Sequence, residues 1–86
     1  MGAAPVAGRL GPIPTRGHLE WTLAETTSAP IDLEVFDLAG RGVMRERLAP
    51  GRVAAFDLPD DLRAGVYLVS IRQGGREVRA RTVLVR

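Results

Sequence analysis

Hydrophobic and polar residues alternate along several short runs of this chain. In residues 18–23, Leu19, Trp21 and Leu23 alternate with polar side chains, and residues 31–35 repeat the pattern. A period of two residues places every second side chain on the same face of a β-strand. Both runs therefore predict strands with one buried face. Trp21 shares that face with the two leucines, which favours packing in the core over stacking on a sugar.

The last third of the chain carries the clearest pair of strands. At a period of two residues, one face of the first strand holds Tyr67, Val69 and Ile71, and one face of the second holds Val78, Ala80, Thr82 and Leu84, while residues 83–85 are apolar on both faces. Gly74 and Gly75 stand between the two runs, and adjacent glycines accept the positive φ values of a tight hairpin turn. The pattern predicts an antiparallel hairpin closed by a two-residue loop.

Weaker strand signals fill the middle of the chain. Residues 43–48 are rich in charge, and residues 53–58 place Phe56 and Leu58 on one face. Phe36 breaks the preceding alternation, so we expect it to cover a sheet edge or the second face of its sheet. Helical periodicity is missing, and strand signals recur about every 8–12 residues, as in immunoglobulin-like domains. The predicted fold is all-β, an immunoglobulin-like antiparallel β-sandwich of about seven strands.

The N-terminal segment has a different composition. Residues 1–17 hold seven Ala or Gly residues and three prolines, a content that disfavours helices and central strands. We predict that residues 1–17 form a flexible or extended Pro/Gly-rich arm and that residues 18–86 form the sandwich domain. Residues 1–9 lack the charged start and the long apolar core of a signal peptide. The chain is therefore interpreted as an excised domain of a longer exported protein or as a short free-standing protein.

Charge and composition exclude several classes of partner. The formal net charge is +2, all twelve basic residues are Arg, and four residues are aromatic. A nucleic-acid-binding domain normally gathers its basic residues on one face with aromatic residues among them, so no nucleic-acid partner is expected. No apolar run approaches the ~18–20 residues of a membrane-spanning helix, so no stable membrane insertion is expected. Glutamates interleave with the arginines, which favours a solvated, salt-bridged face.

The sequence contains few residues that could catalyse a reaction or bind a metal ion. Cys is absent and His18 is the only His, so catalysis or metal binding would lack a thiolate and a second imidazole. Asp57, Asp60 and Asp61 form the one carboxylate cluster, and their spacing favours turn formation over a calcium loop. The sequence predicts no enzyme activity, no metal site and no cofactor.

Residues 12–86 resemble the C-terminal sorting domain, type A, of proteins exported by the bacterial type IX secretion system. The similar segments follow the family's order: Pro12-Ile13-Pro14 with Gly17, residues 33–41 (LEVFDLAGR), residues 62–69 (LRAGVYLV), Gly74-Gly75 and residues 83–86 (VLVR). Ile13 stands where the family usually has Asn, and Gly42 loosens the turn. The Gly-hydrophobic-Tyr motif is also similar to that of a related immunoglobulin-like module found in flagellar-hook capping and cell-surface proteins.

The resemblance implies a sorting signal at the end of a larger exported bacterial protein. Such a signal directs its protein by way of the periplasm and the outer-membrane type IX translocon to the cell surface or the medium. We expect recognition to use the last hairpin together with the turn at residues 37–41. The residues predicted to contact the translocon are Asp37, Gly40, Arg41, Gly65, Tyr67, Gly74, Gly75, Arg79, Arg81, Val83, Leu84, Val85 and Arg86.

A self-associating extracellular structural subunit is the alternative interpretation. Val6, Leu10 and Ile13 supply apolar side chains to the N-terminal arm, and an extended arm can add as a strand to the open sheet edge of a neighbouring copy. Repeated head to tail, that contact builds a filament or an adhesion module. Removal of residues 1–11 distinguishes the two interpretations, because it should dissolve assemblies under the second and leave sorting unchanged under the first.

Overall fold

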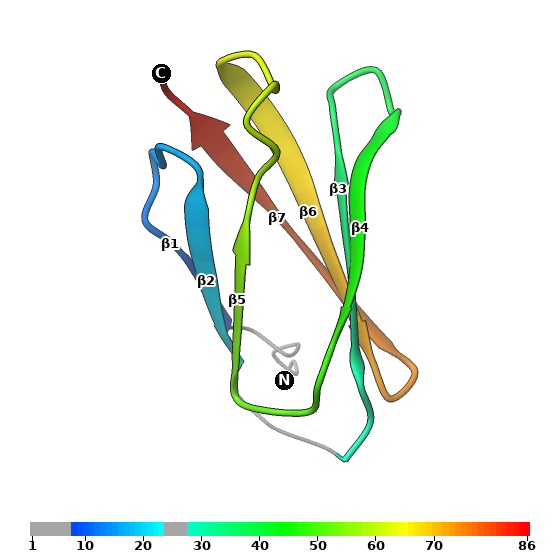
Figure 1. Ribbon diagram of the computed structural model, residues 1–86. Coiled ribbons are helices and arrows are strands. Elements are labelled where there is room, and N and C mark those ends of the chain that lie inside the picture. Colours follow the sequence, from blue (N-terminus) through cyan, green and yellow to red (C-terminus); the bar gives the residue numbers. More distant parts are fainter. Residues whose placement is uncertain (1–7, 24–27) are drawn as a thin grey trace, which may run out of the picture.

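In the part of the chain that the structure describes, seven strands form two antiparallel sheets (Figure 1). The computed structural model describes residues 8–23 and 28–86, and the described residues contain no helix. The three-stranded sheet has the order β1-β2-β5, with β1 at Gly8–Gly11, β2 at His18–Leu23 and β5 at Val53–Asp57. The four-stranded sheet has the order β4-β3-β6-β7, with β4 at Gly42–Leu48, β3 at Ile31–Phe36, β6 at Gly65–Gln73 and β7 at Arg76–Leu84. The all-β class and the number of strands are confirmed.

Both sheets contribute to one hydrophobic core. Every second residue of β2 and of β3 is buried, as the alternation predicted. Trp21 is 1% exposed, which confirms that it belongs to the interior. The core consists of Leu19, Trp21, Leu23, Ile31, Leu33, Val35, Ala54, Phe56, Leu58, Tyr67, Val69, Ile71 and Leu84. Removal of this apolar surface from water is the main force that holds the two sheets together.

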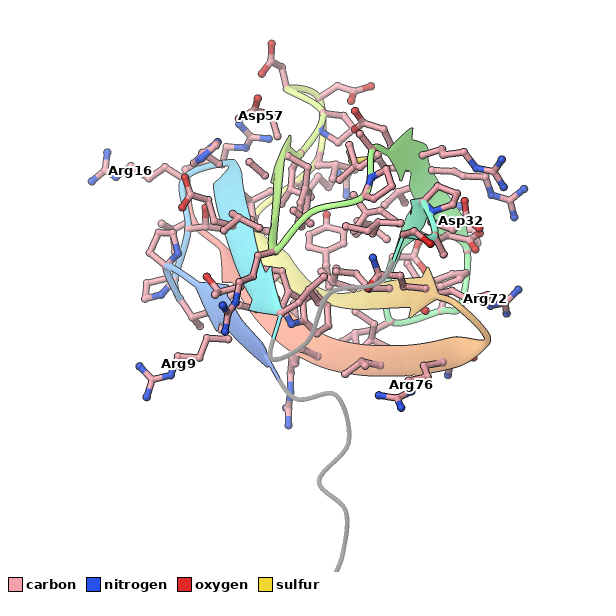
Figure 2. All side chains as sticks on the ribbon, turned by 90° about the horizontal axis from the view of Figure 1, so that it is seen from below. Arg9, Arg16, Asp32, Asp57, Arg72 and Arg76 are labelled. Atoms are coloured by element: carbon pink, nitrogen blue, oxygen red, sulfur yellow. The ribbon has the colours of Figure 1, made fainter. Side chains whose placement is uncertain are left out.

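Charged side chains lie on the outside of the two sheets. Figure 2 shows Arg9, Arg16, Arg72 and Arg76 pointing away from the interior on different sides of the molecule. The arginines are thus spread around the described part of the chain.

The structure differs from the expected arm at residues 8–11. These residues form β1, an edge strand that pairs with β2, and Leu10 packs against the core. Gly8 allows this close approach, because a Cβ atom there would lie 2.6 Å from Trp21 Nε1. Gly8, one of the small residues that suggested a linker, instead lets the chain approach the indole ring. Val6, which also entered the prediction of an arm, lies outside the described residues.

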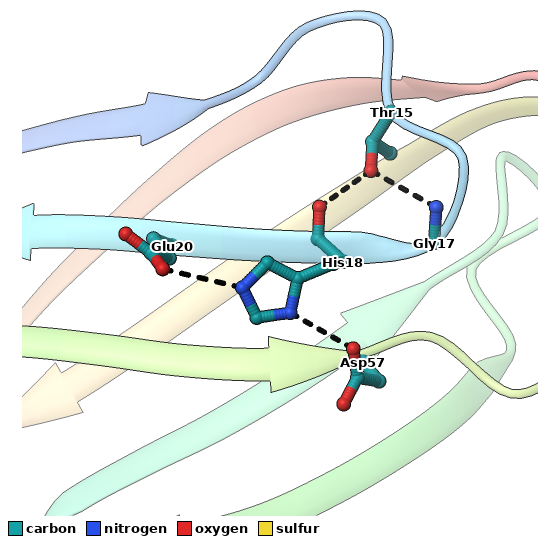
Figure 3. A network of polar contacts seen from close by, with 5 residues as sticks. All are labelled: Thr15, Gly17, His18, Glu20 and Asp57. Atoms are coloured by element: carbon teal, nitrogen blue, oxygen red, sulfur yellow. Dashed lines mark hydrogen bonds and ion pairs between the residues drawn. The ribbon is translucent and has the colours of Figure 1, made fainter.

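Thr15 joins the two sheets beside β7. Its N–H donates to the Val83 carbonyl oxygen at 2.8 Å, and its own carbonyl oxygen accepts the Val85 N–H at 2.9 Å. Its hydroxyl donates to the His18 carbonyl oxygen at 2.6 Å and accepts the Gly17 N–H at 3.0 Å (Figure 3). Because Thr15 is 1% exposed, these bonds are sheltered from water. They fix the end of β7 against the start of β2.

The last two strands form the hairpin that the adjacent glycines predicted. Gln73 pairs with Arg76, which leaves Gly74 and Gly75 as a two-residue loop. The φ values of the two glycines are +57° and +82°, and positive values at both central positions are typical of a type I′ turn. The prediction of this hairpin is confirmed.

The Tyr67 hydroxyl fixes the loop that precedes β6. It donates to the Arg63 carbonyl oxygen at 2.7 Å, while the ring belongs to the core. We expect Tyr67→Phe to lower the free energy of unfolding by about 1 kcal/mol, because one hydrogen bond is lost and the ring packing is kept. Urea denaturation of the two proteins measures the difference. An unchanged denaturation midpoint would show that this hydrogen bond contributes nothing to stability.

Candidate recognition surface

A tight turn at residues 37–41 joins β3 to β4. Asp37 Oδ1 accepts the N–H groups of Ala39 and Arg41, both at 2.9 Å, and Asp37 Oδ2 accepts the Nε–H of Arg41 at 3.0 Å. Gly40 has a φ of +88°, a conformation that residues with a Cβ atom rarely adopt. The bonds from the Arg41 backbone and then from its guanidinium hold the pKa of Asp37 below its ordinary value. The turn therefore keeps one shape and presents Arg41 to solvent.

This turn and the C-terminus lie at the same end of the four-stranded sheet (Figure 1). Phe36, which precedes the turn, lies opposite Leu68, and Gly65 lies opposite Leu84. The register brings together most residues predicted for recognition: Asp37, Gly40, Arg41, Gly65, Tyr67, Val83, Leu84, Val85 and Arg86. Gly74 and Gly75 lie at the opposite end and shape the hairpin, while Arg79 and Arg81 lie along β7 between the two ends.

The last residues of the chain are held by neighbouring backbone. The guanidinium of Arg86 donates through Nε to the Leu62 carbonyl oxygen at 3.1 Å and through Nη2 to that of Pro59 at 3.0 Å. Val85 is 37% exposed, whereas Leu84 is 1% exposed. Leu84 therefore acts through the fold, and Val85 is accessible to a partner.

Charged pairs cover one half of the outer face of the four-stranded sheet, nearer the β6–β7 turn. They join Arg47 to Asp32 at 2.8 Å, Arg45 to Glu34 at 3.2 Å and Arg79 to Glu77 at 3.2 Å. The bond from Arg47 lowers the pKa of Asp32. The Ser70 hydroxyl, followed by Arg79, lowers the pKa of Glu77. Most of these residues line an open depression of about 440 Å³, and the prediction of a salt-bridged face is confirmed.

The other half of this outer face is apolar. Phe36 lies beside Leu68, and Val66 lies opposite Val83 in the neighbouring row. All four are half-buried, on the side of the sheet that faces away from the core. Of the two positions predicted for Phe36, a sheet edge or the second face of its sheet, the structure shows the second face. With two exposed neighbours, these residues form a surface that we call the outer apolar patch: Phe36, Leu38, Val66, Leu68, Val83 and Val85.

A polar cluster lies on the outer face of the three-stranded sheet (Figure 3). His18 Nδ1 lies 2.9 Å from Asp57 Oδ1, and His18 Nε2 lies 3.2 Å from Glu20 Oε2. The two ring nitrogens thus meet different carboxylates, and the described residues contain no group of His, Cys, Asp or Glu suited to a metal ion. The bond to Asp57, followed by that to Glu20, raises the pKa of His18. Asp57, which we expected to support a turn, pairs with His18 across β2 and β5.

The His18 cluster makes stability depend on pH. The pKa of His18 is raised above its ordinary value of 6.5 in the folded protein. The stability that the protonated ring contributes is therefore fully present below about pH 6.5 and is lost as the pH rises through the folded pKa. We expect the wild type to lose stability relative to His18→Gln as the pH rises from about 6.5 through the folded pKa of His18. Denaturation midpoints of both proteins across this range measure the effect. Parallel curves would contradict it.

Comparison with known families identifies the chain. The model described as "Secretion system C-terminal sorting domain" matches residues 10–86. The chain belongs to this family. Family members mark proteins that are exported by type IX secretion to the cell surface or the medium, and the sorting domain interacts with the type IX machinery. The family is not known for enzymes.

Two further observations complete the comparison. No curated protein matches the chain. Among the described residues, no helix has the length and apolar character needed to cross a membrane.

Proposed function

We propose that this domain is a folded C-terminal sorting signal that the outer-membrane type IX translocon reads as the exported protein leaves the periplasm. The observation that carries the proposal is the family match, which spans residues 10–86 and therefore both sheets. The domain acts by being bound, and the attached protein is then delivered to the cell surface or released into the medium. Its contribution is a stable shape with accessible contact residues.

The recognition surface in this proposal is the end of the four-stranded sheet that holds the C-terminus. Its support is the register, which puts the turn at residues 37–41 at the same end of the sheet as Gly65 and residues 83–86. The bonds of Asp37 fix that turn before any partner arrives. A preformed surface loses little conformational entropy on binding, which favours affinity.

We also infer that the fold is an immunoglobulin-like sandwich. Its support is the strand order, with β1-β2-β5 in one sheet and β4-β3-β6-β7 in the other. The bond from the Tyr67 hydroxyl to the Arg63 carbonyl oxygen near the start of the sixth strand is similar to the tyrosine corner of such domains. A sandwich of this kind is compact and can remain folded during export.

The filament alternative requires an N-terminal arm that is free to pair with a neighbour. Leu10 packs against the core of its own chain, and β1 pairs with β2. Ile13 remains 50% exposed, which is little apolar surface for strand addition. We therefore propose sorting and do not propose assembly through the arm.

A reporter fusion tests the proposed function. The full chain is placed behind a reporter protein that carries an export signal, in a bacterium with the type IX system. We expect the reporter at the cell surface or in the medium, because the domain supplies the sorting signal. A reporter that remains in the periplasm would contradict the proposal.

A further inference from the structure

The outer apolar patch is a continuous surface. Phe36 and Leu68 are directly opposite, as are Val66 and Val83, and side chains at such positions on one face of a sheet are in contact. Leu38 follows in the turn after β3 and is 70% exposed. Contiguous apolar side chains on a surface are typical of interaction sites, whereas single exposed apolar residues are common everywhere.

Two arginines border the patch, one unpaired within the described part of the chain and one paired with the carboxylate of its own turn. Arg81 lies opposite Leu68, and no carboxylate among the described residues pairs with it. Arg41, in the adjacent turn, has a side chain that is 82% exposed, whereas its partner Asp37 is 19% exposed. Arg81 therefore leaves an uncompensated positive charge at the rim of the patch, and Arg41 extends exposed N–H donors beside it, while the charges on the other half of the face are compensated by ion pairs.

We propose that the outer apolar patch docks on a protein surface of the type IX machinery that is apolar at its centre and carries carboxylates around it. This inference rests on the sorting function proposed above. The apolar side chains are buried in the contact, and the carboxylates of the partner accept hydrogen bonds from Arg81 and Arg41. Complementary charge at the rim guides the encounter and sets its register, and the guanidinium fork suits carboxylates.

Two other occupants fit the patch less well. A two-fold contact between copies would bury Arg81 of both chains without supplying a free carboxylate to pair with it, and an unpaired buried charge opposes association. A lipid surface requires side chains that reach into the bilayer, whereas Phe36, Val66 and Leu68 are half-buried within the sheet. An acidic protein surface matches both the shape and the charge.

Charge-changing variants on two faces of the molecule test this proposal. Leu38→Glu and Arg81→Glu are introduced into the reporter fusion, singly and together. Matched controls are Val53→Glu on β5, where Val53 is 50% exposed, and Arg9→Glu on β1. We expect the double patch variant to lower export at least about tenfold, because it places a charge in the apolar contact and reverses the charge at its rim, and the controls to stay within about twofold of wild type.

The outcomes separate this inference from the function on which it rests. The side chains that are changed in the patch variants and in the controls are all exposed, so the thermal unfolding temperature of each purified domain should equal that of wild type. If Leu38→Glu nevertheless unfolds the domain, Leu38→Ser replaces it. Normal export of the double patch variant beside normal export of wild type overturns the docking surface and leaves the sorting function intact. Failure of wild type to be exported overturns both. Flotation of the purified domain with anionic phospholipid vesicles, or a dimer lost in Leu38→Glu, would assign the patch to another occupant and overturn the proposal.

Discussion

Removal of residues 83–86 is expected to abolish both the folding of the domain and the export of a reporter fused to it. The truncation deletes Leu84, which is 1% exposed, and the two backbone hydrogen bonds that Thr15 makes with β7. It also deletes Arg86, whose guanidinium holds the loop before β6. Loss of one large core side chain costs about 2–5 kcal/mol, and small domains are stable by only about 5–15 kcal/mol. Together with the hydrogen bonds that are lost, this cost is comparable with the lower end of that range, where a domain of this size is expected to lie.

Two measurements follow the truncation, protease resistance of the purified domain and localisation of the fused reporter. Arg86→Ala is the matched control, because it removes the two guanidinium bonds and keeps Leu84 and the backbone of β7. We expect this control to remain folded, which separates loss of the fold from loss of the Arg86 side chain alone. Export of the truncated fusion at the wild-type level would contradict a role for the folded C-terminal strand.

Replacement of Trp21 by Ala is the second large effect that we expect. Trp21 is the largest of the fully buried side chains and lies beneath Gly8 of β1. Truncation of a buried Trp costs about 3–5 kcal/mol, through lost burial and the cavity left behind. The variant should unfold at much lower urea concentration than wild type, and β1 should lose its support on the indole. Urea denaturation followed by circular dichroism measures the change.

Trp21→Phe is the control that separates packing from hydrogen bonding. The indole N–H of Trp21 is buried and has no hydrogen-bond partner among the described residues, and an unsatisfied buried donor opposes folding. Phe removes this donor and keeps an aromatic ring, so its loss of stability should be less than half that of Trp21→Ala. Equal losses in the two variants would show that the indole donor is satisfied in solution.

The elements with a regular period could be predicted from the sequence. The alternation of Leu19, Trp21 and Leu23 identified β2, and Gly74 with Gly75 identified the last hairpin, because both signals are local. Strand β1 was missed because Leu10 is the only large apolar residue in Gly8–Gly11. Its pairing depends on the absence of a side chain at Gly8, which matters only once Trp21 lies beneath it.

The candidate site could be predicted only in part, because it depends on strand register. The turn at residues 37–41 could be recognised from its own sequence. Its position at the same end of the sheet as the C-terminus follows from the pairing of β3 with β6 and of β6 with β7, which no local pattern specifies. The outer apolar patch was missed for the same reason. Phe36 was out of phase, but Leu68 became its neighbour only through the register.

The localisation of the fused reporter in two hosts tests the central claim most directly. The hosts differ only in the type IX translocon, and the full chain is fused behind the same exported reporter in both. The reporter should appear at the surface or in the medium of the host with the translocon and should accumulate in the periplasm of the host without it. The same distribution in both hosts would contradict the conclusion that this domain is read by the type IX system.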